Sequence, residues 1–147
     1  MITIRKSTSN DAPALADIWR DSALATHDFL SPSDFQEIET MVRQQYLPNA
    51  EVWVVEENES PVGFMGMTDN HIDSLFIAPS MRGKGVGKQM IAHAKALFDN
   101  QITVDVNEQN SQGFGFYLHM GFVQTGRTDI DDQGKPYPIL KLKLNAA

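Results

Sequence analysis

The stretch of sequence that decides the fold is rich in glycine and flanked by cations: Arg82-Gly83-Lys84-Gly85-Val86-Gly87-Lys88. It follows an apolar run that ends in a proline, Leu75-Phe76-Ile77-Ala78-Pro79, and it opens an amphipathic helix. At a helix start the unpaired backbone N–H groups and the helix dipole attract anions, and glycines let the backbone approach phosphate oxygens closely. The order of strand, glycine turn and helix therefore predicts a site for a pyrophosphate-bearing ligand.

Two well-known nucleotide-binding loops do not fit this stretch. A P-loop has four residues between its first glycine and its Gly-Lys pair, and Ser or Thr follows. Here Gly83 and Gly87 enclose three residues, and Gln89 follows Lys88. A dinucleotide fingerprint needs a further glycine where Lys88 stands. The spacing excludes both motifs and leaves either another phosphate ligand or a basic turn that merely links a strand to a helix.

The composition is that of one globular domain. With 147 residues, 41% of them hydrophobic and 21% charged, the chain is long enough for one core and too short for two ordinary domains, so we expect a single domain over residues 1–147. No apolar stretch approaches the roughly 20 residues that span a bilayer, and the amino-terminal residues lack the apolar centre of a signal peptide. These features predict a cytoplasmic protein without a membrane partner.

The absence of cysteine and the acidic charge exclude several kinds of chemistry. Without cysteine there is no disulfide, no thiolate metal site and no covalent acyl-cysteine intermediate. The four histidines lack metal-ligand spacing, so we expect no metal. The net charge of −7 argues against nucleic acid as a partner and weakly favours a cationic one, such as an amine.

Hydrophobic periodicity predicts a mixed α+β fold with one central sheet. Strands are expected at residues 2–5, 51–56, 62–67, 71–77, 102–106, 121–127 and 139–144. Helices are expected up to about residue 25, from residue 31, and over residues 85–99 and 111–120, with tight turns at 58–61 and 69–70. The clearest apolar stripe lies on the third helix and comprises Val86, Met90, Ile91, Ala94, Leu97 and Phe98.

A second group of residues narrows the choice of ligand: Asn107-Glu108-Gln109-Asn110, Phe116-Tyr117 and Gly121-Phe122. Together with Arg82-x-x-Gly85-x-Gly87 they resemble the two signatures of the GNAT family of N-acetyltransferases, in that family's order and separation. The resemblance implies the GNAT acyl-CoA N-acyltransferase fold. That fold has a mostly antiparallel sheet of about seven strands, four helices, and strands 4 and 5 splayed apart.

Shorter segments are similar to the bacterial YjaB-like branch of the family: His27-Asp28-Phe29-Leu30, 106–110 and 134–138. One position departs from the family pattern, because Gly113 stands where alanine is usual. Glycine weakens a helix by about 1 kcal/mol relative to alanine. Close approach of the cofactor would explain Gly113, whereas nothing in the sequence explains Gly115.

The resemblance implies acetyl-CoA as co-substrate and assigns residues to it. The pyrophosphate would bind the amides of residues 83–88, and pantetheine would pair with the backbone of residues 75–77 and bond the Asn110 side chain. One amide of that strand would polarise the thioester carbonyl, as in an oxyanion hole. The residues expected to contact the cofactor are Leu75, Phe76, Ile77, Arg82, Gly83, Lys84, Gly85, Val86, Gly87, Lys88, Asn110 and Tyr117.

The resemblance also makes Tyr117 the general acid that protonates the departing thiolate. Ordinary phenol and thiol pKa values lie within about 2 units of each other, which suits such a transfer. The alternative for Tyr117 is an aromatic side chain that simply packs in the core.

His71 is the expected general base, because some family members carry a carboxylate near this position. His71 and Asp73 leave the same face of one strand, and an imidazole titrates close to neutral pH. The alternative is that His71 is an exposed turn residue, and the base is another side chain or a water.

Two further segments are expected near the acceptor. In the family, the loop that carries His27, Asp28 and Phe29 lines the acceptor pocket, although helix capping and packing would also explain these residues. Tyr137 lies in an acidic, turn-rich segment and would grip a cationic amine, unless that segment is a plain solvated turn. His93 and His119 are expected to be solvated.

The sequence thus predicts transfer of an acetyl group from acetyl-CoA directly to a primary amine within a ternary complex. The acceptor is a small-molecule amine, a peptide or protein lysine, or an N-terminal amine. A non-catalytic acyl-CoA-binding or regulatory module is the alternative, and a nucleotide-binding protein is a distant third. The sequence does not decide between a monomer and a homodimer.

Overall fold

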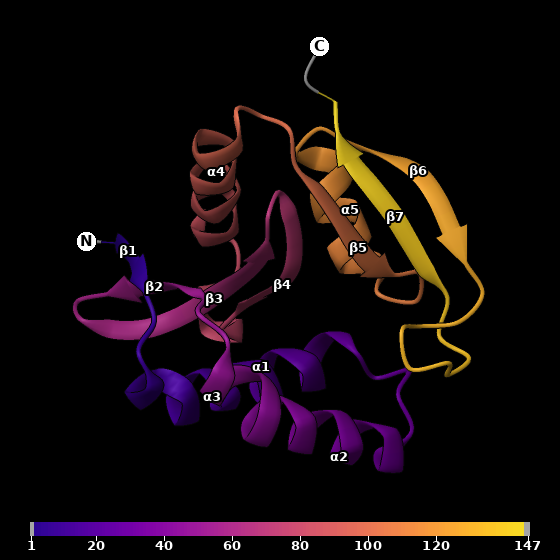
Figure 1. Ribbon diagram of the computed structural model, residues 1–147, viewed down its shortest axis with the longest axis horizontal. Coiled ribbons are helices and arrows are strands. Elements are labelled where there is room, and N and C mark those ends of the chain that lie inside the picture. Colours follow the sequence, from indigo (N-terminus) through magenta and orange to yellow (C-terminus); the bar gives the residue numbers. More distant parts are fainter. Residues whose placement is uncertain (1, 146–147) are drawn as a thin grey trace. The chain divides into compact units, whose positions relative to one another are not determined.

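The computed structural model describes residues 2–145 and contains a seven-stranded sheet and four long helices (Figure 1). The strands are β1 (Ile2–Lys6), β2 (Trp53–Glu57), β3 (Ser60–Thr68), β4 (His71–Ile77), β5 (Thr103–Asn107), β6 (Phe122–Thr128) and β7 (Ile139–Leu144). The helices are α1 (Ala12–Thr26), α2 (Pro32–Met41), the short α3 (Leu47–Asn49), α4 (Val86–Phe98) and α5 (Ser111–His119). Single turns form η1 (Ser9–Asp11), the π-helical η2 (Val42–Tyr46) and η3 (Pro79–Met81).

The strands follow the order β1-β2-β3-β4-β5-β7-β6. β1 with β2, β2 with β3, β5 with β7 and β6 with β7 are antiparallel, whereas β4 runs parallel to β5. The β4–β5 ladder joins His71 to Thr103 and Ile72 to Val104, at the start of both strands. This mixed, mostly antiparallel sheet confirms the expected fold.

The described residues form two compact units, and the boundary between them falls inside β4 and inside α4. The first unit holds residues 2–67 and 74–90, and the second holds 68–73 and 91–145. None of the helices within residues 2–145 combines the length and the apolar character needed to cross a membrane.

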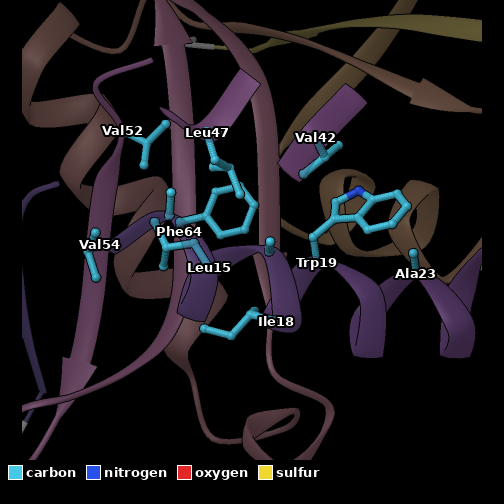
Figure 2. Close-up of a cluster of buried hydrophobic side chains, with 11 residues drawn as sticks. Leu15, Ile18, Trp19, Ala23, Val42, Leu47, Val52, Val54 and Phe64 are labelled. Carbon is cyan, nitrogen blue, oxygen red and sulfur yellow. The ribbon is translucent and has the colours of Figure 1, made fainter. Parts of the chain in front are cut away.

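The first unit is built around the buried face of α1. Leu15, Ile18 and Trp19 recur at helical spacing, as the sequence predicts, and they pack against the β2 and β3 side chains Val54 and Phe64 (Figure 2). Each such buried aliphatic or aromatic side chain contributes about 1.5–3 kcal/mol to stability. The full cluster is Ala12, Leu15, Ala16, Ile18, Trp19, Ala23, Val42, Leu47, Val52, Val54 and Phe64.

The second unit has strands with one apolar face and one polar face. Along β7, Leu140, Leu142 and Leu144 are buried, whereas Lys141 and Lys143 between them are exposed. β5 alternates in the same way, and α5 packs on β5 and β6. The alternation leaves the polar side chains of β5 and β7 together on one face of this part of the sheet.

The expected order of strands and longer helices is confirmed. The short helix α3 and the single turns were not expected, and the other differences lie at element ends. Ser60 and Pro61, expected in a turn, belong to β3, because Asn58 and Glu59 close the hairpin alone with positive φ values of 52° and 71°. Leu97, expected in the buried stripe of α4, is 45% exposed. Leu97 lies in the last turn of α4, so the apolar face of this helix becomes exposed to solvent before the helix ends.

Candidate functional site

The glycine turn has the geometry expected of an anion-binding loop. Gly83 and Gly85 have φ values of +76° and +80°, which residues with a side chain rarely adopt. An added Cβ at either position would meet no neighbouring atom, so the backbone conformation, and not crowding, is what requires glycine here. The turn is exposed, whereas Val86, which begins α4, is buried. The buried Val86 side chain therefore fixes the start of α4, whose amides have no partner within the helix.

Arg82 turns its side chain toward α1. Its Nη2 donates to the carbonyl oxygen of Ser22 at 3.4 Å and lies 3.3 Å from the Ser22 hydroxyl. Ser22 is a buried polar residue in the last turns of α1. The Arg82 side chain therefore ties the glycine turn to α1, and sequence reasoning missed this partner because the two residues are 60 positions apart.

The β4 segment expected to pair with pantetheine is half-buried and anchored by Phe76. The Phe76 ring lies 5.7 Å from the ring of Phe64, 6.3 Å from Trp19 and 6.2 Å from His27. The side chain of Phe76 thus belongs to the core of the first unit. Any contact between Phe76 and a cofactor would therefore fall to its backbone.

His27 is a packed, neutral imidazole. Burial lowers its pKa to about 4; the nearby charge of Arg82 acts in the same direction, and Asp28 opposes it. Its Nδ1 lies 2.8 Å from the Thr26 hydroxyl, and its ring lies 5.3 Å from that of Phe29. A base with so low a pKa holds a proton poorly at neutral pH. Asp28 is exposed, and the N-cap of α2 is Ser31, so Asp28 does not cap that helix.

A hydroxyl pair that the sequence did not reveal lies beside β4. The phenol oxygen of Tyr46 is 2.9 Å from the hydroxyl oxygen of Ser74, which also accepts a bond from the Gly66 N–H at 3.1 Å. An added Cβ on Gly66 would come 2.1 Å from the Tyr46 oxygen. Tyr46 ends the π-helical turn η2, and such turns are frequent at functional sites.

In the second unit, Asn110 caps α5. Its Oδ1 accepts the Gly113 N–H at 3.0 Å. A Cβ on Gly113 would approach the Asn110 Nδ2 to 2.5 Å. Packing against the cap therefore explains Gly113, in place of the cofactor approach expected from the sequence. Gly115 has open space around its Cβ position, and nothing in the structure explains it.

Tyr117 is buried on α5 between two aromatic rings. It is 7% exposed, and its ring lies 5.2 Å from Phe116 and 5.4 Å from Phe122, both edge to face. Burial raises the pKa of the Tyr117 phenol, so the group keeps its proton at neutral pH. The pKa of Tyr117 in the free protein therefore lies further above that of a thiol than the ordinary phenol value would.

His71 is a partnered residue at the start of β4, not a free turn residue. Its Nδ1 lies 2.7 Å from the Thr103 hydroxyl, and its Nε2 lies 3.6 Å from a carboxylate oxygen of Asp105. The same oxygen of Asp105 is 3.6 Å from the Lys141 ammonium. Asp73, expected to act beside His71, is exposed and accepts a bond from the Thr68 hydroxyl at 2.6 Å.

The connection between β6 and β7 is a turn that the Asp131 side chain closes by hydrogen bonds. One carboxylate oxygen of Asp131 accepts the N–H groups of Gln133 and Lys135, both at 2.9 Å, so this acidic residue is committed to the turn. Tyr137, expected to present itself to an amine, is buried at 8% exposure.

The remaining histidines differ from each other. His119 is exposed, as expected, whereas burial lowers the pKa of His93, which is half-buried and therefore not the solvated residue expected. Within residues 2–145, no group of three or more His, Asp or Glu side chains is arranged to hold a metal ion.

Comparison with known proteins gives one family. Residues 18–137 match the acetyltransferase (GNAT) domain. The chain is 50% identical to the peptidyl-lysine N-acetyltransferase YjaB of Salmonella typhimurium over 143 residues, 97% of each chain. It is 48% identical to the Escherichia coli protein of the same name, covering 97% of this chain and 96% of the relative.

Solved structures agree with this comparison. The solution structure of apo YjaB from Escherichia coli matches with a TM-score of 0.94 at 46% identity, covering 100% of this chain and 99% of that one. An N-acetyltransferase from Thermoplasma acidophilum, solved in complex with coenzyme A, shares the fold with a TM-score of 0.79 at 21% identity, covering 97% and 99%. The chain belongs to the GNAT family of acetyltransferases and resembles its YjaB members.

Proposed function

We propose that this protein transfers an acetyl group from acetyl-CoA to a primary amine. The observation that carries the proposal is the turn in which Gly83 and Gly85 adopt positive φ directly before α4. Such a turn presents several amides to a pyrophosphate, and the family and its coenzyme A-bound members support acetyl-CoA as the donor.

The donor would contact two sets of residues. In the first unit, the amides of residues 83–88 would bind the pyrophosphate, and the backbone of residues 75–77 would pair with pantetheine. In the second unit, Asn110 uses its Oδ1 to cap α5, so a bond to a pantetheine carbonyl would come from its Nδ2. The Arg82 side chain would act indirectly, by fixing the turn against Ser22.

The transfer would be direct, within a ternary complex. The neutral amine nitrogen attacks the thioester carbon, the C–S bond breaks, and the sulfur leaves as a thiolate that takes a proton from Tyr117. The proton that the nitrogen loses as the amide forms returns to the Tyr117 phenolate, directly or through water. The lack of cysteine in the chain supports this route over an acyl-cysteine intermediate. Because burial raises the pKa of Tyr117, this phenol enters the reaction protonated, as a general acid must.

His71 would take the proton that the acceptor ammonium loses. It lies on the polar face of the sheet in the second unit, whereas His27, with its pKa lowered to about 4, is a poor base at neutral pH. His27 and Phe29 would instead shape the acceptor loop by packing. Asp28 is the exposed acidic residue of that loop and would meet a cationic acceptor.

The proposed acceptor is the side-chain amine of a lysine in a peptide or protein. The relatives at 50% and 48% identity are named peptidyl-lysine N-acetyltransferases, which supports this class above small-molecule amines and N-terminal amines. We propose that the two units act together as one acetyltransferase domain. The cytoplasmic location, the absence of nucleic-acid and membrane partners, and the choice between monomer and homodimer stay predictions from the sequence.

The experiment is release of free thiol from acetyl-CoA in the presence of lysine peptides, N-terminal amines and small amines. Peptides with trimethyl-lysine serve as the control, because they keep the charge and lack a nucleophilic nitrogen. We expect release with lysine peptides and a mass gain of one acetyl group on the lysine. Binding of acetyl-CoA without release for any acceptor would favour the alternative, a non-catalytic acyl-CoA-binding module.

A further inference from the structure

The two ring nitrogens of His71 have different partners. Nδ1 lies 2.7 Å from the hydroxyl oxygen of Thr103, within hydrogen-bond distance. Nε2 lies 3.6 Å from the carboxylate oxygen of Asp105, too far for a strong hydrogen bond but close enough for a charge interaction. Nδ1 therefore has a hydroxyl as its neighbour, and Nε2 has a carboxylate.

Strand register creates this arrangement. His71 pairs with Thr103 across the parallel β4–β5 ladder, and Asp105 lies two residues further along β5 on the same face. Val104, between them, points to the opposite face and is buried. Asp105 in turn pairs with Lys141 across the antiparallel β5–β7 ladder. Four side chains from three strands therefore share one polar face.

The charges around the ring determine which nitrogen carries hydrogen. A neutral imidazole has one N–H and one lone pair. A hydrogen on Nε2 points its positive end toward the Asp105 carboxylate, whereas a lone pair there would face the anion and be repelled. The favoured tautomer has the hydrogen on Nε2. Its lone pair on Nδ1 accepts the hydroxyl hydrogen of Thr103.

We propose that Thr103 relays the acceptor proton to Nδ1 of His71, and that Asp105 is a positioning residue that holds the tautomer this relay requires. The proposal rests on the proposed function, in which His71 is the base. The proton of the acceptor ammonium moves to the Thr103 oxygen while the original hydroxyl hydrogen moves to Nδ1. The products are a neutral amine, an intact threonine and an imidazolium whose Nε2–H faces Asp105.

Other charged groups lie near this cluster. Lys141 faces Asp105 from β7, Lys143 pairs opposite Thr103 on β7, and Asp73 on β4 is bonded to Thr68. The side chains of His71 and Asp105 are 33% and 30% exposed, so water weakens each of these interactions.

The first test compares Thr103→Val with Thr103→Ser, since valine keeps the shape of threonine and serine keeps the hydroxyl. We expect Thr103→Val to lower kcat for a lysine peptide about tenfold or more at pH 7, and less at pH 10, where more of the acceptor is already neutral. Thr103→Ser should stay within about threefold of the natural protein. The KM for acetyl-CoA should not change in either variant. Equal activity of the valine variant and the natural protein, or equal losses in both variants, would overturn the relay.

The second test compares kcat for a lysine peptide in Asp105→Asn and Lys141→Met. Loss of the carboxylate removes the anion that favours hydrogen on Nε2, so kcat should fall severalfold in Asp105→Asn, whereas Lys141→Met keeps that anion and should stay within about twofold of the natural protein. Equal kcat in Asp105→Asn and the natural protein would contradict the positioning role of Asp105.

The third test needs no turnover. Nitrogen-15 NMR of the histidine rings reports which nitrogen carries hydrogen, with His71→Gln to assign the signals. We expect hydrogen on Nε2 in the natural protein and a mixture of tautomers in Asp105→Asn. Hydrogen on Nδ1 in the natural protein would overturn the proposal, whether or not the enzyme is active. A natural protein that releases no thiol with any acceptor would instead overturn the proposed function.

Discussion

The candidate donor site and the candidate base are built in different ways. The glycine turn at Gly83 and Gly85 uses backbone amides, and its shape follows from the φ values of a few consecutive residues. The cluster around His71 uses side chains from three strands, and its shape follows from how β4, β5 and β7 pair. A backbone site tolerates changes of side chain and fails when its φ angles are blocked, whereas a side-chain site fails when one functional group is removed.

The largest effect on activity is expected when a side chain of the proposed proton transfer loses its functional group, as in Tyr117→Phe. The variant keeps the ring packing with Phe116 and Phe122 and loses only the phenol hydroxyl. Loss of a general acid costs about 100-fold or more, so kcat should fall by that factor while the KM for acetyl-CoA and the melting temperature stay close to those of the natural protein. Steady-state kinetics with a thermal melt checks this. A kcat within about twofold of the natural value would remove Tyr117 from the proton transfer.

Donor binding by the glycine turn should be weakened in Gly85→Val. A β-branched residue at a φ of +80° is strained by about 1–3 kcal/mol, so the KM for acetyl-CoA should rise about 5- to 100-fold. Gly134→Val is the matched control, because Gly134 has a φ of +78° in an exposed turn and its Cβ would also meet open space. An equal rise in KM in both variants would show that general strain, and not the loop at α4, causes the effect.

The buried His27 and the exposed His119 should differ in how they affect the free energy of unfolding as the pH changes. The folded-state pKa of His27 is about 4, below the roughly 6.5 of an unfolded chain, so the unfolded state binds the proton first and stability falls as pH drops from 7 toward 4. His27→Gln should reduce that loss by about 2 kcal/mol, whereas His119→Gln, at an exposed position, should not.

Urea unfolding at pH 7 and pH 4.5 measures this difference. The same acid-induced loss of stability in His27→Gln and in the natural protein would show that His27 is not held neutral by burial.

The smallest effect is expected on α5, in a comparison of its two glycines. Gly115→Ala should stabilise the protein by about 0.5–1 kcal/mol, because alanine favours a helix and the added Cβ meets open space. Gly113→Ala should give no gain, because its Cβ would lie 2.5 Å from the Asn110 amide, and displacing this cap offsets the helix propensity of alanine. Equal gains in the two variants would show that the Asn110 cap adapts at no cost.

The comparison also explains what sequence reasoning could reach. The strand before the glycine turn, the turn itself and the start of α4 are encoded by consecutive residues, and the expected β4 and β7 limits match the observed ones. The positive φ of Gly83 and Gly85 follows from the same local signal. Family resemblance then supplied Asn110 and Tyr117, which lie at the N-cap of α5 and within α5, in agreement with the expected helix.

The side-chain partners could not be read in this way. Alternation along a strand places Thr103 and Asp105 on one face, but only the register between β4 and β5 puts that face beside His71. Arg82 likewise contacts Ser22, which is 60 positions away in the chain. Burial was also hidden, because Tyr137 in a turn-rich acidic segment looks solvated in sequence and is enclosed in the structure.

The central claim is that the glycine turn holds the donor while the His71 cluster serves proton transfer. Calorimetric titration of acetyl-CoA into the natural protein, Gly85→Val and Thr103→Val tests this most directly. We predict that the Kd rises about tenfold in Gly85→Val and stays within about twofold in Thr103→Val, even though Thr103→Val loses turnover. Equal weakening of donor binding in both variants would contradict the division between a backbone-built donor site and a side-chain-built base.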